Sequence, residues 1–179
     1  MKILGLDSSG IVASVAIVED ENLIAEYTVN YKKTHSQTLL PMLDELVKMT
    51  ELDLDTIDAI AVAAGPGSFT GLRIGSATAK GLGLALKKPL VEIPTVDALA
   101  YNLYDSRALI CPIMDARRSQ VYTGIYRFQE HKLVTVEAQM AVPMAEMIEK
   151  LNARGEEVVF LGDGVPVFGK MIQENLKVP

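Results

Sequence analysis

The stretch Ile3-Leu4-Gly5-Leu6-Asp7 near the start of the chain has a counterpart in Cys111-Pro112-Ile113-Met114-Asp115. In both places an apolar run, which predicts a buried strand, ends at an aspartate and turns tightly into a second apolar strand. When the two stretches are superposed aspartate on aspartate, the strand expected at residues 14–18 falls on residues 122–126. Identity between the copies is low, so the repeat is one of pattern, and it predicts one supersecondary unit used twice.

Each copy is predicted to hold three strands, a helix, a strand and a second helix. A further strand and helix follow in the first copy, and this alternation indicates crossover connections and a largely parallel inner sheet. In the first copy we expect strands at residues 2–7, 13–18, 23–29, 58–64 and 89–93 and helices at 35–49, 70–86 and 96–104. In the second copy we expect strands at residues 111–115, 122–126, 132–138 and 158–161 and helices at 144–154 and 166–176.

The start of the first helix has two interpretations. Thr34 and Gln37 have the spacing of a capping box, which would place Pro41 inside the helix and predict a kink there. Alternatively, the helix begins nearer Thr38. The sequence does not decide between them.

Two β-β-β-α-β-α units in tandem are typical of the duplicated α/β fold shared by actin, sugar kinases and Hsp70, which is ribonuclease H-like. We therefore predict two domains, residues 1–105 and residues 106–179. The second is the shorter, and the sequence leaves open whether it is incomplete at its C-terminal end. In this fold the aspartate of each first hairpin faces the cleft between the domains, where it can hold a metal and phosphate.

Composition excludes several classes of protein. The net charge of −6 and the scattering of the basic residues in pairs argue against a chain that grips nucleic acid alone. Residues 3–6 are too short for the apolar core of a signal peptide, and no later stretch has the length of a membrane span. We therefore expect a cytoplasmic protein. The single cysteine, Cys111, lies in an apolar run and is interpreted as a buried core thiol.

Four residues are weak candidates for a nucleotide or phosphate site. Asp7 and Ser8 begin a turn of small residues that would let backbone amides approach an anion. Asp115 ends the equivalent strand, but the bulkier Ala116-Arg117-Arg118 that follows suits a phosphate poorly. Asp163 lies between two glycines after a strand. Each is also an ordinary turn residue, so we predict no catalytic residue, no metal ligand and no cofactor.

The glycine-rich loop Gly65-Pro66-Gly67-Ser68-Phe69-Thr70-Gly71 follows a strand and precedes a helix. It lacks the Lys-Ser/Thr of a P-loop, the third glycine of a dinucleotide fingerprint and the flanking glycines of a nucleophile elbow. A structural turn is the stronger interpretation. His35 and His131 have no second histidine at helical spacing, so neither begins a zinc motif.

The helix after this loop carries small residues every four positions. Glycine costs about 1 kcal/mol relative to alanine inside a helix, so close approach of another backbone is expected in return. The approaching backbone could belong to the chain's own sheet or to a partner. For the second case we predict a partner interface on this helix and the preceding one, comprising Leu39, Leu43, Leu46, Gly71, Arg73, Gly75, Ala79 and Gly83. A folded, monomeric Ala79→Glu variant that no longer binds its partner is then expected.

Several segments together resemble the bacterial TsaB family, also called YeaZ. They are Ile3 to Ser9, Thr34 to Pro41, Gly65 to Gly75, Pro94 to Ala100 and Asp115 to Tyr122, so the resemblance covers most of the chain.

This resemblance implies a noncatalytic subunit that binds the similar but longer TsaD directly through helices, in one complex with the ATPase TsaE. These proteins place a threonylcarbamoyl group on N6 of the adenosine beside the anticodon of ANN-decoding tRNAs. In TsaD an H-x-x-x-H pair holds a metal, and the matching positions here are Asp97 and Tyr101. The resemblance also places Asp163 where TsaD-like chains have glycine. It implies a homodimer when the chain is alone, contact with tRNA only through the partner, and no membrane.

An alternative from another class remains open at this point. The chain could be a small ATP-dependent kinase or hydrolase of the same fold that uses Asp7 and Asp115. The missing histidines and the bulky second hairpin favour the noncatalytic subunit.

Overall fold

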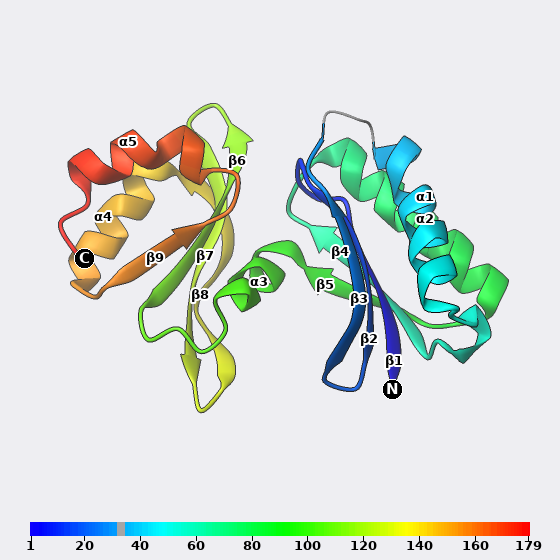
Figure 1. Cartoon of the computed structure of the whole chain (residues 1–179). Coiled ribbons are helices and arrows are strands. Elements are labelled where there is room, and N and C mark those ends of the chain that lie inside the picture. The colour runs from blue at the N-terminus through cyan, green and yellow to red at the C-terminus, as the bar shows by residue number, and fades with distance from the viewer. Residues whose placement is uncertain (32–34) are drawn as a thin grey trace. The chain divides into compact units, whose positions relative to one another are not determined.

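The computed structural model describes residues 1–31 and 35–179. Backbone contacts divide the chain into two compact units, Met1–Thr95 and Val96–Pro179, each with a sheet and helices of its own (Figure 1). We describe each unit by itself.

The first unit is a five-stranded mixed sheet with two long helices. Its strand order is β3-β2-β1-β4-β5, in which β1 pairs antiparallel with β2 and parallel with β4, and β4 pairs parallel with β5. The parallel inner strands confirm the crossover connections expected from the alternating elements. The elements are β1 (Lys2–Asp7), β2 (Ala13–Glu19), β3 (Asn22–Val29), α1 (His35–Thr50), η1 (Leu54–Thr56), β4 (Ala59–Gly65), α2 (Phe69–Leu86) and β5 (Leu90–Pro94).

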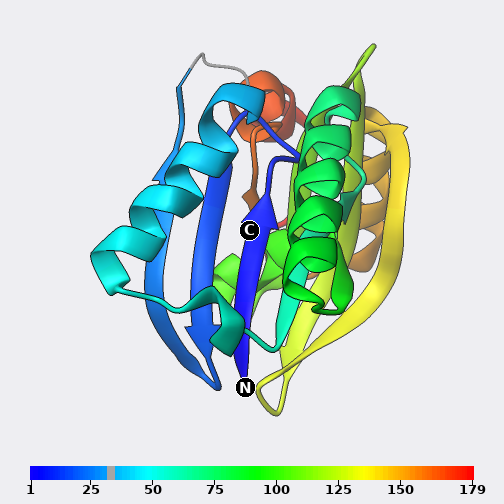
Figure 2. The same cartoon turned by 90° about the vertical axis from the view of Figure 1, so that its right-hand side faces the viewer.

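Both helices lie side by side on one face of this sheet (Figure 2). Leu4 and Leu6 of β1 point to the helices, as do Val15 and Ile17 of β2, because successive side chains of a strand alternate between faces. From the helices, α1 contributes its apolar stripe and α2 contributes Ala79. This single layered core confirms the α/β class predicted from the strand and helix periods.

Helix α1 runs unbroken from His35 to Thr50 with Pro41 inside it. Of the two interpretations of its start, the structure therefore supports the earlier one. The predicted capping box includes Thr34, which lies outside the described residues.

The second unit is a four-stranded sheet of order β8-β7-β6-β9, in which β6 pairs antiparallel with β7 and parallel with β9. Its helices α4 and α5 cover the face that carries Cys111 and Ile113, and the short α3 and η2 pack on the opposite face over Ile110 and Tyr126. The predicted boundary after residue 105 placed α3 and η2 in the first domain, whereas backbone contacts place residues from Val96 onward in the second unit. The elements are α3 (Thr95–Ala100), η2 (Tyr101–Leu103), β6 (Leu109–Arg117), β7 (Gln120–Gln129), β8 (Lys132–Pro143), α4 (Met144–Arg154), β9 (Val158–Leu161) and α5 (Val165–Asn175).

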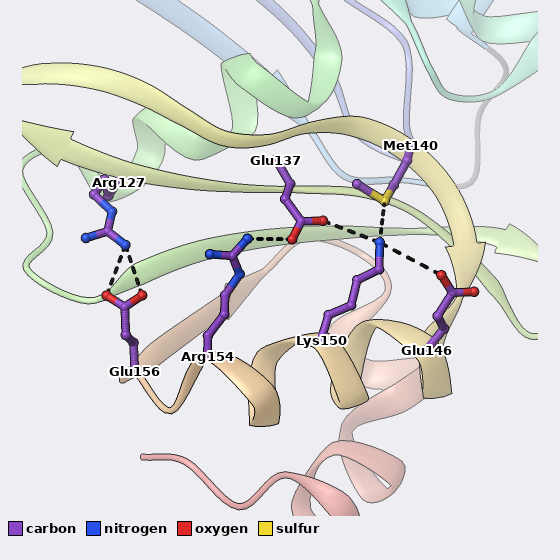
Figure 3. Close-up of polar contacts among 7 residues, drawn as sticks. All are labelled: Arg127, Glu137, Met140, Glu146, Lys150, Arg154 and Glu156. Atoms are coloured by element: carbon purple, nitrogen blue, oxygen red, sulfur yellow. Dashed lines mark hydrogen bonds and ion pairs between the residues drawn. The ribbon is translucent and has the colours of Figure 1, made fainter.

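An ion-pair network ties α4 to β8 (Figure 3). The Glu137 carboxylate accepts from Arg154 Nη2 at 2.6 Å and from Lys150 Nζ at 3.4 Å, and Lys150 also lies 3.8 Å from Glu146. The hydrogen bond from Arg154 holds the pKa of Glu137 below its usual value, and the charge of Lys150 adds to this. The network therefore favours the ionised carboxylate and the docked helix.

The two units repeat the same element order, three strands, helix, strand, helix, and the same pairing around the first strand. This confirms the predicted duplication. The predicted register is one residue wrong. Asp7 pairs with Ser14 on the face away from α1 and α2, whereas Asp115 pairs with Val121 on the face that α4 and α5 cover. Because side chains alternate with period two, the helix-facing leucines Leu4 and Leu6 superpose on Cys111 and Ile113 only after a one-residue shift.

No helix within residues 1–31 and 35–179 is long and apolar enough to cross a membrane.

Candidate functional site

The turn after β1 packs directly on the glycine-rich loop that precedes α2. Ser68 N donates to the carbonyl of Ser9 at 2.6 Å, and the Ser8 hydroxyl donates to the carbonyl of Gly71 at 2.9 Å. Asp7 Oδ1 accepts from Ser9 N at 2.8 Å and closes the turn. Ser8 and Ser9 are buried. The small residues that suggested a phosphate loop therefore serve contacts between two segments of the first unit.

The glycines of α2 explain how these backbones come so close. A Cβ on Gly71 would overlap the carbonyl of Ser8, and one on Gly75 would lie 2.6 Å from Ser8 Oγ. On Gly83 it would lie 2.8 Å from the side chain of Leu90 in β5. The small-residue stripe thus makes room for the end of β1 and for the edge strand β5 to pack closely on α2.

This placement corrects the predicted partner interface. The small residues that recur every four positions in α2 are buried in the first unit, as are three of the four leucines of α1, and Ala79 is 0% exposed. A four-residue spacing shows that one helix face is close-packed, but it does not show against what. Of the predicted interface, only Arg73 is exposed, and Leu39, Leu43, Leu46, Gly71, Gly75, Ala79 and Gly83 are buried.

The outward sides of α1 and α2 carry apolar residues that the spacing did not reveal. Leu40 is 51% exposed, Phe69 69% and Leu84 83%. Gly81 is exposed too, and a Cβ there would meet no atom within 4 Å. We call the exposed apolar residues of these two helices, namely Leu40, Met49, Phe69, Ala77, Gly81 and Leu84, the outer helical face. In α2 a signal was present in the sequence, since Phe69, Ala77, Gly81 and Leu84 also share one helical face, but the more regular stripe masked it.

In the second unit the structure brings two predicted candidates together. Asp163 Oδ1 accepts from the amide of Asp115 at 3.1 Å, and Asp115 accepts from the amide of Arg117 at 2.9 Å. Gly162 and Gly164 abut the carbonyl of Ile113, which a Cβ at either position would crowd. Both carboxylates thus hold turns in place. Arg117, Arg118 and Ser119 all have positive φ, so the hairpin tip presents bulky side chains from a strained backbone.

Asp97 and Tyr101, which the resemblance places at the metal-ligand positions of TsaD, form contacts within the second unit. Tyr126 Oη donates to Asp97 Oδ1 at 2.6 Å, and burial together with this bond raises the pKa of the Tyr126 phenol. Tyr101 packs edge-on against Phe128 with 5.8 Å between ring centroids. Asp97 therefore anchors α3 to β7, a role that the sequence did not indicate.

The cysteine and the two histidines of the chain have surroundings that fit structural roles. Burial raises the pKa of the Cys111 thiol to about 12, so it is protonated at neutral pH. His35 Nε2 lies 2.8 Å from the carbonyl of Gly10, and His131 Nδ1 lies 3.1 Å from Asp105. In the described part of the chain, no three His, Cys, Asp or Glu residues gather as metal ligands would.

Two sheets with the same order of corresponding strands, each with an aspartate at or near the end of its first strand, define a duplicated α/β protein of the actin-like class. The comparisons with known proteins narrow this class. Residues 22–178 match the family model described as "TsaD: tRNA N6-adenosine threonylcarbamoyltransferase".

The chain belongs to the TsaB family. It is 36% identical to the tRNA threonylcarbamoyladenosine biosynthesis protein TsaB of Bacillus subtilis (strain 168), over 98% of this chain and 77% of that protein. It is 30% identical to the protein of the same name in Escherichia coli (strain K12), over 92% of this chain and 72% of that protein. The solved structure of YeaZ from Pseudomonas aeruginosa superposes with a TM-score of 0.72 at 31% identity, covering 79% of this chain and 66% of that one.

Proposed function

We propose that this chain takes part in the biosynthesis of threonylcarbamoyladenosine in tRNA as a noncatalytic subunit that binds and supports TsaD. The observation that carries the proposal is the pair of contacts at the TsaD-like metal positions. Asp97 is held by Tyr126 and Tyr101 by Phe128, so neither side chain is arranged as a metal ligand. The threonylcarbamoyl transfer would then take place on TsaD, with the ATPase TsaE in the same complex.

The first-unit turn supports the same proposal. In the actin-like fold this turn would receive phosphate, yet the Ser8 hydroxyl is buried and bonded to Gly71. The kinase or hydrolase alternative requires Asp7 and Asp115 to act as a pair. Asp7 lies on the sheet face away from the helices of its unit, whereas Asp115 lies on the face that the helices of its unit cover. The two aspartates therefore lack the equivalent positions that this alternative assumed.

The outer helical face is the surface that we propose for TsaD. It presents exposed Leu40, Phe69 and Leu84 on two adjacent helices, and Gly81 leaves room for a close approach. Helices dock well where small residues let their backbones come close, and exposed apolar patches mark protein interfaces. In the absence of TsaD, we propose that a second copy of the chain occupies the same face. Contact with tRNA would be made by the assembly rather than by this acidic chain alone.

The test is reconstitution of tRNA modification from purified TsaD, TsaE, tRNA and a threonylcarbamoyl donor, with and without this chain. We expect product only when the chain is present, and no ATP hydrolysis by the chain alone. ATP hydrolysis by the isolated chain that is lost in Asp7→Ala would restore the enzyme alternative.

The interface has a matched pair of variants. Gly81→Glu places a carboxylate on the outer helical face, and Gly169→Glu places one on α5, where a Cβ also meets nothing within 4 Å. Burying an unpaired charge in an interface costs about 3 kcal/mol or more, which is about a hundredfold in affinity. We expect Gly81→Glu to lose TsaD binding and self-association while Gly169→Glu keeps both. Equal binding by the two variants would place the interface elsewhere.

A further inference from the structure

A groove runs along the flank of α2 that faces away from α1. It has a volume of about 530 Å³ and is open to solvent. The side chains that line it include Phe69, Leu72, Arg73 and Lys80 from α2, Val62 from β4 and Glu92 from β5. Its lining is therefore largely apolar and lies between a helix and a sheet. All of these residues belong to the first unit.

One border of the groove is the edge strand of the sheet. β5 is the last strand in the order β3-β2-β1-β4-β5. Its inner side faces β4, since the carbonyl of Pro89, just before β5, accepts from Ile60 N of β4 at 3.0 Å. Because parallel strands alternate the direction of their backbone groups, the N–H and C=O groups of Leu90 and Glu92 point to the outer edge. Both residues are exposed. Within the described residues no strand pairs with this edge, so it offers backbone donors and acceptors beside an apolar groove.

The groove also carries an excess of positive charge in an acidic protein. Arg73 and Lys80 lie two turns apart on α2, and Glu92 is the one acidic residue of the lining. The Arg73 guanidinium lies 3.9 Å from the centroid of the Phe69 ring, and this cation–π contact holds the cation beside an aromatic residue of the lining. Neither Arg73 nor Lys80 forms an ion pair with any described residue. Two cations without acidic partners beside a hydrogen-bonding edge favour an anionic, extended ligand.

We infer that this groove binds an extended acidic segment of a partner protein, which adds a strand to the free edge of β5. Main-chain hydrogen bonds to Leu90 and Glu92 supply the pairing. Apolar side chains of the segment enter over Val62 and Leu72, and its carboxylates meet Arg73 and Lys80. The groove shares Phe69 and Ala77 with the outer helical face, whereas Lys80, Glu92 and the free edge of β5 belong to the groove alone. The inference does not rest on the proposed binding of TsaD, because the peptide is tested on the isolated chain.

The test uses three fluorescein-labelled dodecapeptides and fluorescence anisotropy with the full chain. One peptide alternates valine and glutamate, the second has glutamine for glutamate, and the third is the first peptide with N-methylated backbone amides. We expect the first to bind, and each of the other two to bind about tenfold more weakly, since one lacks the charges and the other the backbone donors. Binding of the first peptide should also weaken at high salt.

Variants of the chain locate the site. Lys80→Glu reverses a charge in the groove, and Lys170→Glu makes the same change on α5, where the lysine side chain is 88% exposed. Lys80→Glu should weaken binding about tenfold, with Lys170→Glu unchanged and both variants giving the wild-type circular dichroism spectrum. The inference fails if the first peptide does not bind, if all three peptides bind alike, if the two variants behave alike, or if inorganic phosphate displaces the peptide and so identifies a small-anion site.

Discussion

Replacing Ala79 by glutamate should unfold the first unit rather than give a folded monomer. The residue is 0% exposed and lies in the core between α2 and the sheet. A glutamate there must be neutralised, because an unpaired charge is not tolerated in an apolar core. At pH 7, neutralising a group with an ordinary pKa of about 4.3 costs about 3.7 kcal/mol. Overpacking adds about 1–3 kcal/mol.

The total, about 5–7 kcal/mol, is comparable with the whole stability of an ordinary domain. Gly81→Glu, two residues further along the same helix, should instead be neutral or stabilising by up to about 1 kcal/mol, because glycine is a poor helix former and the position is open. Urea unfolding followed by circular dichroism measures both.

The pH dependence separates the two causes of the Ala79→Glu effect. The folded state would raise the pKa of the new carboxyl, so the neutralisation cost is present above the unfolded-state pKa and disappears as the pH falls below it. At pH 4 the variant should therefore recover most of its deficit and keep only the overpacking cost. An unchanged urea midpoint for Ala79→Glu at pH 7 would refute the inward orientation of the small-residue stripe.

Three further predictions concern the rest of the molecule. Gly71→Ala should destabilise by about 1–3 kcal/mol, because its Cβ meets the Ser8 carbonyl, whereas Gly81→Ala should stabilise by about 0.5–1 kcal/mol in the same urea assay. Glu137→Gln should lower the free energy of unfolding by up to about 1 kcal/mol at pH 7, and the loss should vanish as the pH falls through the lowered pKa of Glu137, with the exposed Glu149→Gln as control. Cys111, whose pKa burial raises to about 12, should react with a thiol reagent at pH 8 only when urea unfolds the second unit, as labelling followed by mass spectrometry would show.

The fold was predictable from the sequence because its signals are local. Apolar runs of strand length and the periodic helices gave every strand and every long helix, with ends off by a few residues, the largest error being the extension of β8 to Pro143. The buried β4 and the alternation of strands with helices gave the parallel crossovers. The duplication followed from the order of elements, which tolerates low identity.

The register of the duplication was not predictable by the same means. An aspartate at the end of a strand is a turn residue on either face, and both Asp7 and Asp115 accept the amide two residues ahead. Only the pairing of Asp7 with Ser14 and of Asp115 with Val121 shows that they lie on different faces. Two turns with the same hydrogen bond can therefore follow strands whose aspartates point to different faces of their sheets.

The error at the partner surface has a related physical origin. Gly71, Gly75 and Ala79 recur because a backbone approaches closely, and such a spacing is the same whether the approaching chain is β1 or a second protein. The deciding observation is which atoms a Cβ would meet, namely Ser8 at Gly71 and Gly75 and nothing at Gly81. Helix α2 thus packs one face on its own sheet, and its exposed side carries the two surfaces that we propose for TsaD and for a peptide. Variants at Ala79, Gly81 and Lys80 therefore test, one at a time, the folding of the first unit, the proposed TsaD surface and the proposed peptide groove.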